Sequence, residues 1–104
     1  MSEAAFEREL KAAAKSGKIV LGARRSIKLL LRNAVKGVVI SDNAPADVRK
    51  TVENLAALNK VPVHTYKGTS VELGSVIGKP FRVSVIAIID PGDSKILDVI
   101  SQQA

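Results

Sequence analysis

Four short apolar segments along the chain have the pattern of β-strands. They cover residues 19–21, 38–40, 61–66 and 83–89. The first, second and fourth are almost continuously hydrophobic, which is typical of strands that are buried on both faces. Pro62 cannot donate a hydrogen bond to a neighbouring strand, so we place it either in an edge strand or at the point where its strand begins.

Between these segments, apolar residues recur every three or four positions, which predicts amphipathic helices. The predicted helices cover residues 4–15, 23–34, 45–55, 69–77 and 96–100. Pro45 suits the first turn of the third helix, and Thr69-x-x-Glu72 has the pattern of a capping box at the start of the fourth. The expected buried face of the second helix consists of Ala23, Ile27, Leu30, Leu31 and Ala34.

Helices and strands therefore alternate along the whole chain, which predicts an α/β fold with helices on both faces of a sheet. No linker, internal repeat or low-complexity tract interrupts the pattern, so we expect a single domain spanning residues 1–104. Hydrophobic residues make up 46% of the sequence but aromatic residues only 3%. The core must therefore consist mainly of valine, isoleucine, leucine and alanine.

The sequence contains no cysteine, which excludes disulfides and cysteine-based metal sites. The N-terminal segment carries Glu3, Glu7 and Glu9 and lacks the apolar run of a signal peptide. The longest uncharged stretch, 83–89, is far shorter than the ~18 residues that span a membrane. We expect a soluble, cytoplasmic protein without a membrane partner.

Positive charge is concentrated in one part of the chain. Sixteen Lys and Arg residues against ten Asp and Glu residues give a net charge of +6. Eight of the basic residues lie between Lys11 and Lys36, a segment without any acidic residue. On the predicted second helix, Arg24, Lys28 and Arg32 form a row with a spacing of four residues. This local excess favours an anionic partner such as a nucleic acid.

Signals for catalysis are weak. Gly74-x-x-x-Gly78-Lys79 has one intervening residue too few for a phosphate-binding loop, and Pro80 stands where such a loop has its Ser or Thr. His64 is the only histidine, so a metal site would lack imidazole partners, and a packing or surface role is expected instead. Ser26 has no histidine base at a recognisable spacing, and we interpret it as a helix-surface hydroxyl or a phosphate ligand. We expect no enzyme activity, cofactor or metal.

The segment around Gly22 could bind an anion. A glycine between a strand and a helix lets a ligand approach the backbone, and the helix N-terminus offers unpaired N–H groups. Arg24, Arg25 and Lys28 follow directly. The alternative, that Gly22 only permits the turn and that the cations are simply solvated, is equally consistent with the spacing.

A second candidate is the loop Gly78-Lys79-Pro80-Phe81-Arg82. Phe81 stands close to the cations Lys79 and Arg82, an arrangement that can contact a phosphate backbone while the ring packs on an extruded base. The alternative is that Phe81 lies in the core and anchors the loop.

Four blocks of sequence, in this order, are similar to the L30e family of large-subunit ribosomal proteins. They are Ile19-Val-Leu-Gly-Ala-Arg-Arg-Ser-Ile-Lys28, Ser41-Asp-Asn-Ala-Pro45, Gly68-Thr-Ser-Val-Glu-Leu-Gly74 and the segment from Gly78 to Leu97. The resemblance covers almost the whole chain. It implies a three-layer α/β/α sandwich with a mixed four-stranded sheet, as in the superfamily of ribosomal proteins that bind kink-turn RNA.

The resemblance also implies an RNA surface made of three loops. In it, Gly22, Arg24, Ser26 and Lys28 would meet the bent phosphate backbone and the bases of an internal loop. Asn43 would hydrogen-bond a base or a sugar at the bend. Phe81 and Val83 would pack against an unstacked base, with Lys79 and Arg82 near phosphates.

The residues after Gly22 distinguish branches of this superfamily. General kink-turn binders of ribosomes and guide-RNA particles carry Asn-Glu after this glycine, whereas Arg24-Arg25 follow Ala23 here. This favours the L30e branch and a structural role in the ribosome, with ribosomal RNA and other ribosomal components as partners and a monomer when free. The alternatives are a component of another kink-turn ribonucleoprotein, and a small ligand-binding α/β domain.

Overall fold

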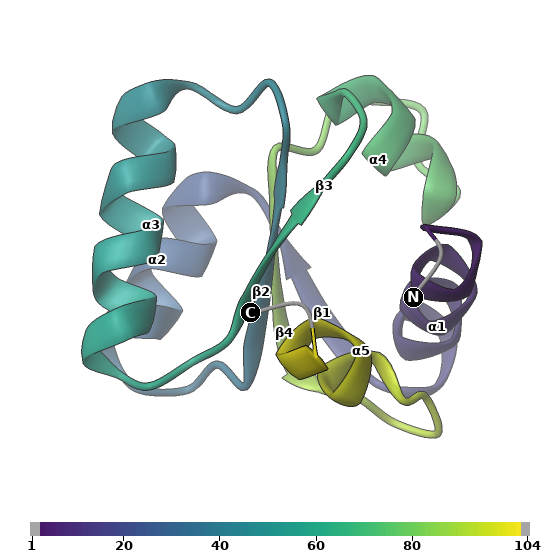
Figure 1. The fold of residues 1–104 in the computed structure, drawn as a ribbon, viewed down its shortest axis with the longest axis horizontal. Coiled ribbons are helices and arrows are strands. Elements are labelled where there is room, and N and C mark those ends of the chain that lie inside the picture. Colours follow the sequence, from purple (N-terminus) through teal and green to yellow (C-terminus); the bar gives the residue numbers. More distant parts are fainter. Residues whose placement is uncertain (1–2, 103–104) are drawn as a thin grey trace.

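The computed structural model describes residues 3–102 and has a four-stranded sheet between two layers of helices (Figure 1). The strands are β1 (Lys18–Leu21), β2 (Gly37–Ser41), β3 (Val63–Tyr66) and β4 (Val85–Asp90). Their order in the sheet is β1-β4-β2-β3. Strand β4 is antiparallel to both β1 and β2, whereas β2 and β3 are parallel. The expected three-layer fold with a mixed four-stranded sheet is confirmed.

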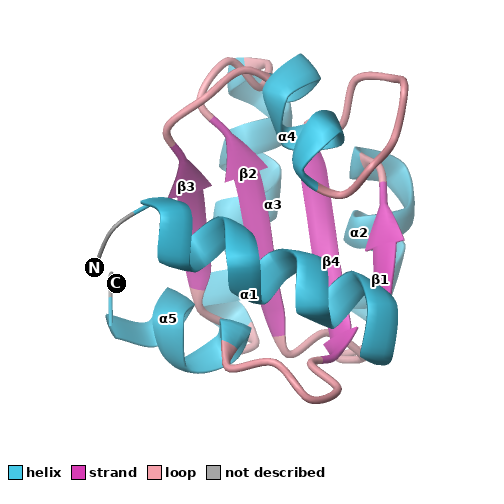
Figure 2. Ribbon diagram, turned by 90° about the vertical axis from the view of Figure 1, so that its right-hand side faces the viewer, coloured by secondary structure: helices cyan, strands magenta, loops and turns pink. Residues whose placement is uncertain are grey.

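Helices cover both faces of the sheet (Figure 2). They are α1 (Glu3–Ser16), α2 (Ala23–Leu31), α3 (Ala46–Leu58), α4 (Ser70–Val76) and α5 (Ile96–Gln102). Helices α1, α4 and α5 lie on one face, and α2 and α3 lie on the other (Figures 1 and 2). None of the helices described is long and apolar enough to cross a bilayer.

Alternating side chains of the strands divide the core into two clusters. In β4, Ile86 and Ile88 pack with Phe6 and Leu10 of α1, whereas Val85 and Ala87 pack under α2 and α3 with Leu30. Successive residues of a strand point to opposite faces, so a strand buried on both sides is hydrophobic at every position. This confirms the interpretation of the second and fourth apolar runs, which form β2 and most of β4, whereas β1 is an edge strand whose residues are only partly buried or exposed.

Several local signals are confirmed in detail. Thr69 Oγ1 accepts a hydrogen bond from Glu72 N, and the Glu72 carboxylate accepts one from Thr69 N, which completes the capping box of α4. Pro62 directly precedes β3, which is an edge strand. Pro45 is the N-cap of α3 and not part of its first turn.

Helix α2 is shorter than its periodicity predicts. The helix ends at Leu31, and Asn33 takes a positive φ of 55°, a conformation that asparagine tolerates better than most residues. Leu31 is 67% exposed and Ala34 is also exposed, so the expected burial of these two residues is wrong. The chain has to turn at this point because Lys36 N bonds to Ile88 O and leads into β2.

Glu9 links α1 to the start of α5. Its carboxylate accepts a hydrogen bond of 2.8 Å from Lys95 N, and this bond lowers the pKa of Glu9 below the usual value of 4.5, with a smaller contribution from Arg8 against the opposing effect of burial. Because the folded state binds its proton less readily than the unfolded state, Glu9 stabilises the fold above its usual pKa. This contribution is lost as the pH falls through the lowered pKa.

We therefore expect Glu9→Gln to lower the free energy of unfolding at about pH 7 and to have a smaller effect at about pH 3, below the usual pKa of the carboxyl group, where its contribution is being lost. Urea unfolding of both proteins at the two pH values measures the difference. If the two proteins differ in free energy of unfolding by the same amount at both pH values, the ionised form of the Glu9 carboxylate does not contribute to stability.

Candidate nucleic-acid interface

The loops that contain Gly22, Asn43 and Phe81, which the sequence predicts as RNA contacts, lie at one end of the sheet. Because β4 is antiparallel to β1 and β2, the ends of β1 and β2 meet the start of β4, where Leu21 pairs with Ile86 and Ile40 with Val85. The loops that follow β1 and β2 and the loop that precedes β4 therefore share this end, which is uppermost in Figure 2. We call it the loop end of the sheet.

Backbone hydrogen bonds fix the Gly22 turn to the loop end. Gly22 N donates to Val85 O over 2.9 Å, and Gly22 O accepts from Ser26 N over 3.1 Å. The backbone angles of Gly22, φ 106° and ψ 146°, lie in a region that is strained for every residue with a side chain. Gly22 is the N-cap of α2, and no side chain caps this helix. The first N–H groups of α2 are thus available to an anionic ligand.

Positive side chains surround this helix terminus. Arg24, Arg25 and Lys28 are all exposed, and the first turn of α2 contains no acidic residue. Within residues 3–102, the ion pairs join Arg8 to Glu9 and Arg49 to Glu53, so the cations of α2 take part in none. Arg32 is the C-cap and lies at the far end of the helix. Of the row predicted from spacing, Arg24 lies in the first turn at the loop end, Lys28 lies in the last turn of α2, and Arg32 lies beyond it.

Ser26 does not have the surface position expected of it. Its side chain is fully buried, as is that of Leu30 one turn later, and its hydroxyl has no hydrogen-bond partner among the described residues. The physical reason is its place in the apolar stripe, three residues after Ala23 and four before Leu30. In this structure the hydroxyl does not reach the surface, so it is neither the expected surface group nor a phosphate ligand.

Asn43 is held by its carbonyl oxygen. Oδ1 accepts hydrogen bonds from Ser70 N over 2.8 Å and from Ser41 Oγ over 3.1 Å, while the residue as a whole is exposed. Since Oδ1 is occupied, the amide can offer its Nδ2 donors to a ligand.

Arg49 braces the same turn and was not predicted from the sequence. Its Nη2 donates to Ser41 O over 3.0 Å and to Asp42 O over 3.1 Å. An arginine on an exposed helix gives no sequence signal for this role, because the contact depends on how α3 packs beside β2.

Phe81 lies on the surface and not in the core. Its side chain is 54% exposed, and the neighbouring Val71 of α4 is 52% exposed. These two residues line a shallow hollow of about 320 Å³ together with Ser75, Lys79, Pro80 and Arg82. This exposure contradicts the alternative of a buried anchor and leaves an apolar ring between two cations at the surface.

Backbone contacts with α4 hold the Phe81 loop. Lys79 N donates to Gly74 O over 2.9 Å, and Val83 N donates to Ser70 O over 3.0 Å. A Cβ atom at Gly74 would lie only 2.2 Å from Phe81 O, so glycine is required for this close approach. The loop is therefore packed directly against α4.

Val83 belongs to the core and not to the exposed part of the loop. It is only 2% exposed and packs in the cluster that contains Leu73 and Ile86. Strand β4 begins at Val85, later than the predicted start at residue 83. In this structure the Val83 side chain cannot pack against a base, because the protein covers it; it supports the loop from below.

The remaining candidates for chemistry have structural explanations. The His64 ring is buried and packs on Phe6, with the ring centroids 4.1 Å apart. Among the described residues, no three His, Asp or Glu side chains form a group that could hold a metal. The N–H groups of Gly78 and Lys79 bond to Ser75 O and Gly74 O, so they do not form a phosphate cradle.

Comparisons with known proteins agree with the resemblance seen in the sequence. The Ribosomal protein L7Ae/L30e/S12e/Gadd45 family matches residues 4–98. The chain is 43% identical to "Large ribosomal subunit protein eL30" of Saccharolobus solfataricus, covering 97% of this chain and 94% of the relative. The protein of the same name from Sulfolobus acidocaldarius is 45% identical, with 93% of each chain covered. That from Methanothermobacter thermautotrophicus is also 45% identical, covering 91% of this chain and 97% of the relative. The chain therefore belongs to the L7Ae/L30e/S12e/Gadd45 family of ribosomal proteins, in its eL30 branch.

Proposed function

We propose that the protein is a structural constituent of the large ribosomal subunit that binds and stabilises a kink-turn-like internal loop in ribosomal RNA. The observation that carries this proposal is the convergence of the Gly22, Asn43 and Phe81 loops at one end of the sheet. The names of its eL30 relatives support the ribosomal role. The protein acts as a binding component in the cytoplasm, not as a catalyst, and enters the particle as a monomer.

Each part of the loop end has a distinct role in this proposal. The uncapped N-terminus of α2, Arg24 and Lys28 bind phosphates of the bent strand, and Lys79 and Arg82 bind phosphates on the other side. Asn43 donates from Nδ2 to a base or a sugar. Phe81 packs on an unstacked base. Charge supplies affinity, and the three fixed loops read the shape of the bend.

The central experiment is a titration of the purified protein with a kink-turn RNA and with a straight duplex of equal length. We expect much tighter binding to the kink-turn RNA at the same salt concentration. Equal affinity for both would reduce the function to nonspecific charge binding, and no affinity for either would point to a different ligand.

Arg24→Ala and Lys28→Ala are each expected to weaken kink-turn binding and to flatten its salt dependence. Each phosphate contact that is lost should lower the slope of log affinity against log salt concentration by about 0.7–0.9, because fewer counterions are released. Lys36→Ala is the matched control, since Lys36 is exposed and directly precedes β2, at the end of the sheet opposite the loop end. If both variants keep the wild-type affinity and slope, the basic helix is not part of the interface.

A further inference from the structure

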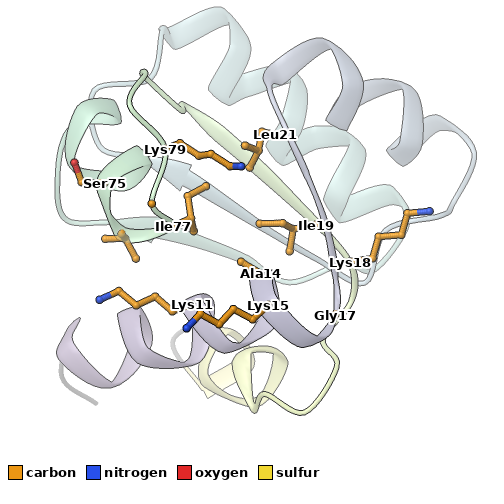
Figure 3. A pocket seen from close by; sticks show the side chains of 12 residues that line it. Lys11, Ala14, Lys15, Gly17, Lys18, Ile19, Leu21, Ser75, Ile77 and Lys79 are labelled. Atoms are coloured by element: carbon orange, nitrogen blue, oxygen red, sulfur yellow. The ribbon is translucent and has the colours of Figure 1, made fainter.

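A second concave surface lies on the face of the sheet opposite α2. This cavity of about 680 Å³ is formed by residues of α1, β1 and the C-terminal part of α4 with the loop that follows it (Figure 3). Its apolar lining includes Ile19, Leu21 and Ile77, which are partly buried at the margin of the core. Because these side chains are accessible from the cavity, it offers an aliphatic surface to a ligand.

Lysines form the rim of the cavity. Lys11 and Lys15 lie one turn apart on α1, and Lys79 reaches across from the loop after α4 toward Leu21 (Figure 3). Lys18 contributes to the lining, but its amine points away from the centre (Figure 3). No acidic residue lines the cavity within the described part of the chain, and these lysines form no ion pair there. Their charge is available to an anionic ligand that also has apolar surface.

The cavity is continuous with the loop end of the sheet. Leu21 directly precedes Gly22, and Lys79 lies two residues before Phe81. Ser75 and Lys79 also line the hollow beside Phe81, so two residues belong to both concave surfaces. A strand that leaves the loop end past Lys79 would pass directly into the cavity.

We propose that this cavity binds single-stranded nucleotides of the RNA that continue from the bend held at the loop end. Lys11, Lys15 and Lys79 bind successive phosphates, and the aliphatic lining packs against ribose and base. An acidic peptide would match the same charge, but continuity through Lys79 favours the RNA that is already bound. Phosphate contacts and aliphatic packing do not read the edges of bases, so the contact is tolerant of base sequence. This inference rests on the proposed function.

The test compares a kink-turn RNA with versions of it that carry a single-stranded extension of about four nucleotides at each strand end in turn. We expect at least one extension to increase the affinity of the protein by about tenfold at moderate salt. The double variant Lys11→Gln/Lys15→Gln should abolish most of this gain and leave binding of the unextended RNA nearly unchanged. Glutamine keeps the helix propensity of lysine, so α1 should fold normally.

The matched control is Lys36→Gln/Lys50→Gln, which removes the same charge from exposed positions outside the cavity. It should retain the gain from the extension. A photoreactive 4-thiouridine in the extension should crosslink to residues of the cavity, and the crosslink should be lost in Lys11→Gln/Lys15→Gln. The gain in affinity and the crosslink are first measured with the wild-type protein, so the reference values do not depend on the folding of any variant.

Several outcomes would overturn the inference. If no extension increases affinity, the cavity does not bind RNA, although the proposed function would stand as long as the unextended RNA binds. Equal losses for both RNAs in the Lys11/Lys15 variant would show a general charge effect. A short peptide of alternating leucine and glutamate tests for a protein partner. If the wild-type protein binds this peptide, the Lys11/Lys15 variant does not, and no RNA extension increases affinity, the cavity binds a protein and not RNA.

Discussion

Replacing Gly22 with alanine should lower both the stability of the protein and its affinity for kink-turn RNA. At φ 106° and ψ 146°, an alanine would be strained by about 1–3 kcal/mol. No atom lies within 4 Å of the position that a Cβ would occupy, so the cost arises from the backbone and not from a clash. Relief of the strain would rotate the first N–H groups of α2 away from their present direction, which weakens the anion site.

Urea unfolding and RNA titration of Gly22→Ala measure the two effects separately. The matched control is Asn33→Ala at the opposite end of α2, where φ is 55° and an alanine is also disfavoured. This control should lose stability without losing RNA affinity. If both variants lose RNA affinity equally, the effect of Gly22→Ala on binding is only a consequence of lower stability.

The expected roles of Ser26 and Val83 show where a linear sequence misleads. Ser26 is polar and follows two arginines, which suggested a surface position. Its spacing from Ala23 and Leu30 nevertheless places it in the buried stripe, and the structure follows the spacing. Val83 lies close to Phe81 in sequence, but its N–H bonds to Ser70 O and its side chain turns into the core. At Ser26, helical spacing predicted burial better than residue type did.

The parts that could be predicted depend on local chemistry. The capping box at Thr69, the apolar strands and the edge position next to Pro62 each follow from interactions within a few residues. The support of Asn43 by Ser70 and the bracing of its turn by Arg49 depend on how distant segments pack together. The same holds for the cavity, whose lysines come from α1 and from the loop after α4. Contacts of this kind join segments that are far apart in the sequence, so they could not be predicted from it.

Ser26→Ala separates a buried structural role from an RNA contact. Its hydroxyl is buried without a hydrogen-bond partner among the described residues, so removing it should keep or slightly raise the free energy of unfolding, by up to about 1 kcal/mol. RNA affinity should not change. A clear loss of affinity in a titration would show that the hydroxyl becomes exposed when RNA binds.

Phe81→Ala should reduce kink-turn affinity by about 1–3 kcal/mol, roughly 5- to 150-fold, because the ring is the aromatic surface available to an extruded base at the loop end. Since Phe81 is 54% exposed, its removal should cost little stability. Phe81→Tyr should retain most of the affinity, and Leu58→Ala, which removes a side chain that is 78% exposed on α3, serves as the control. A fluorescent 2-aminopurine at the unpaired position of the RNA reports stacking directly. If Phe81→Ala quenches the 2-aminopurine fluorescence as strongly as the wild-type protein does, another residue contacts the base. If the variant loses the quenching while the salt dependence of binding stays unchanged, Phe81 packs on the base and α2 binds phosphates independently of it.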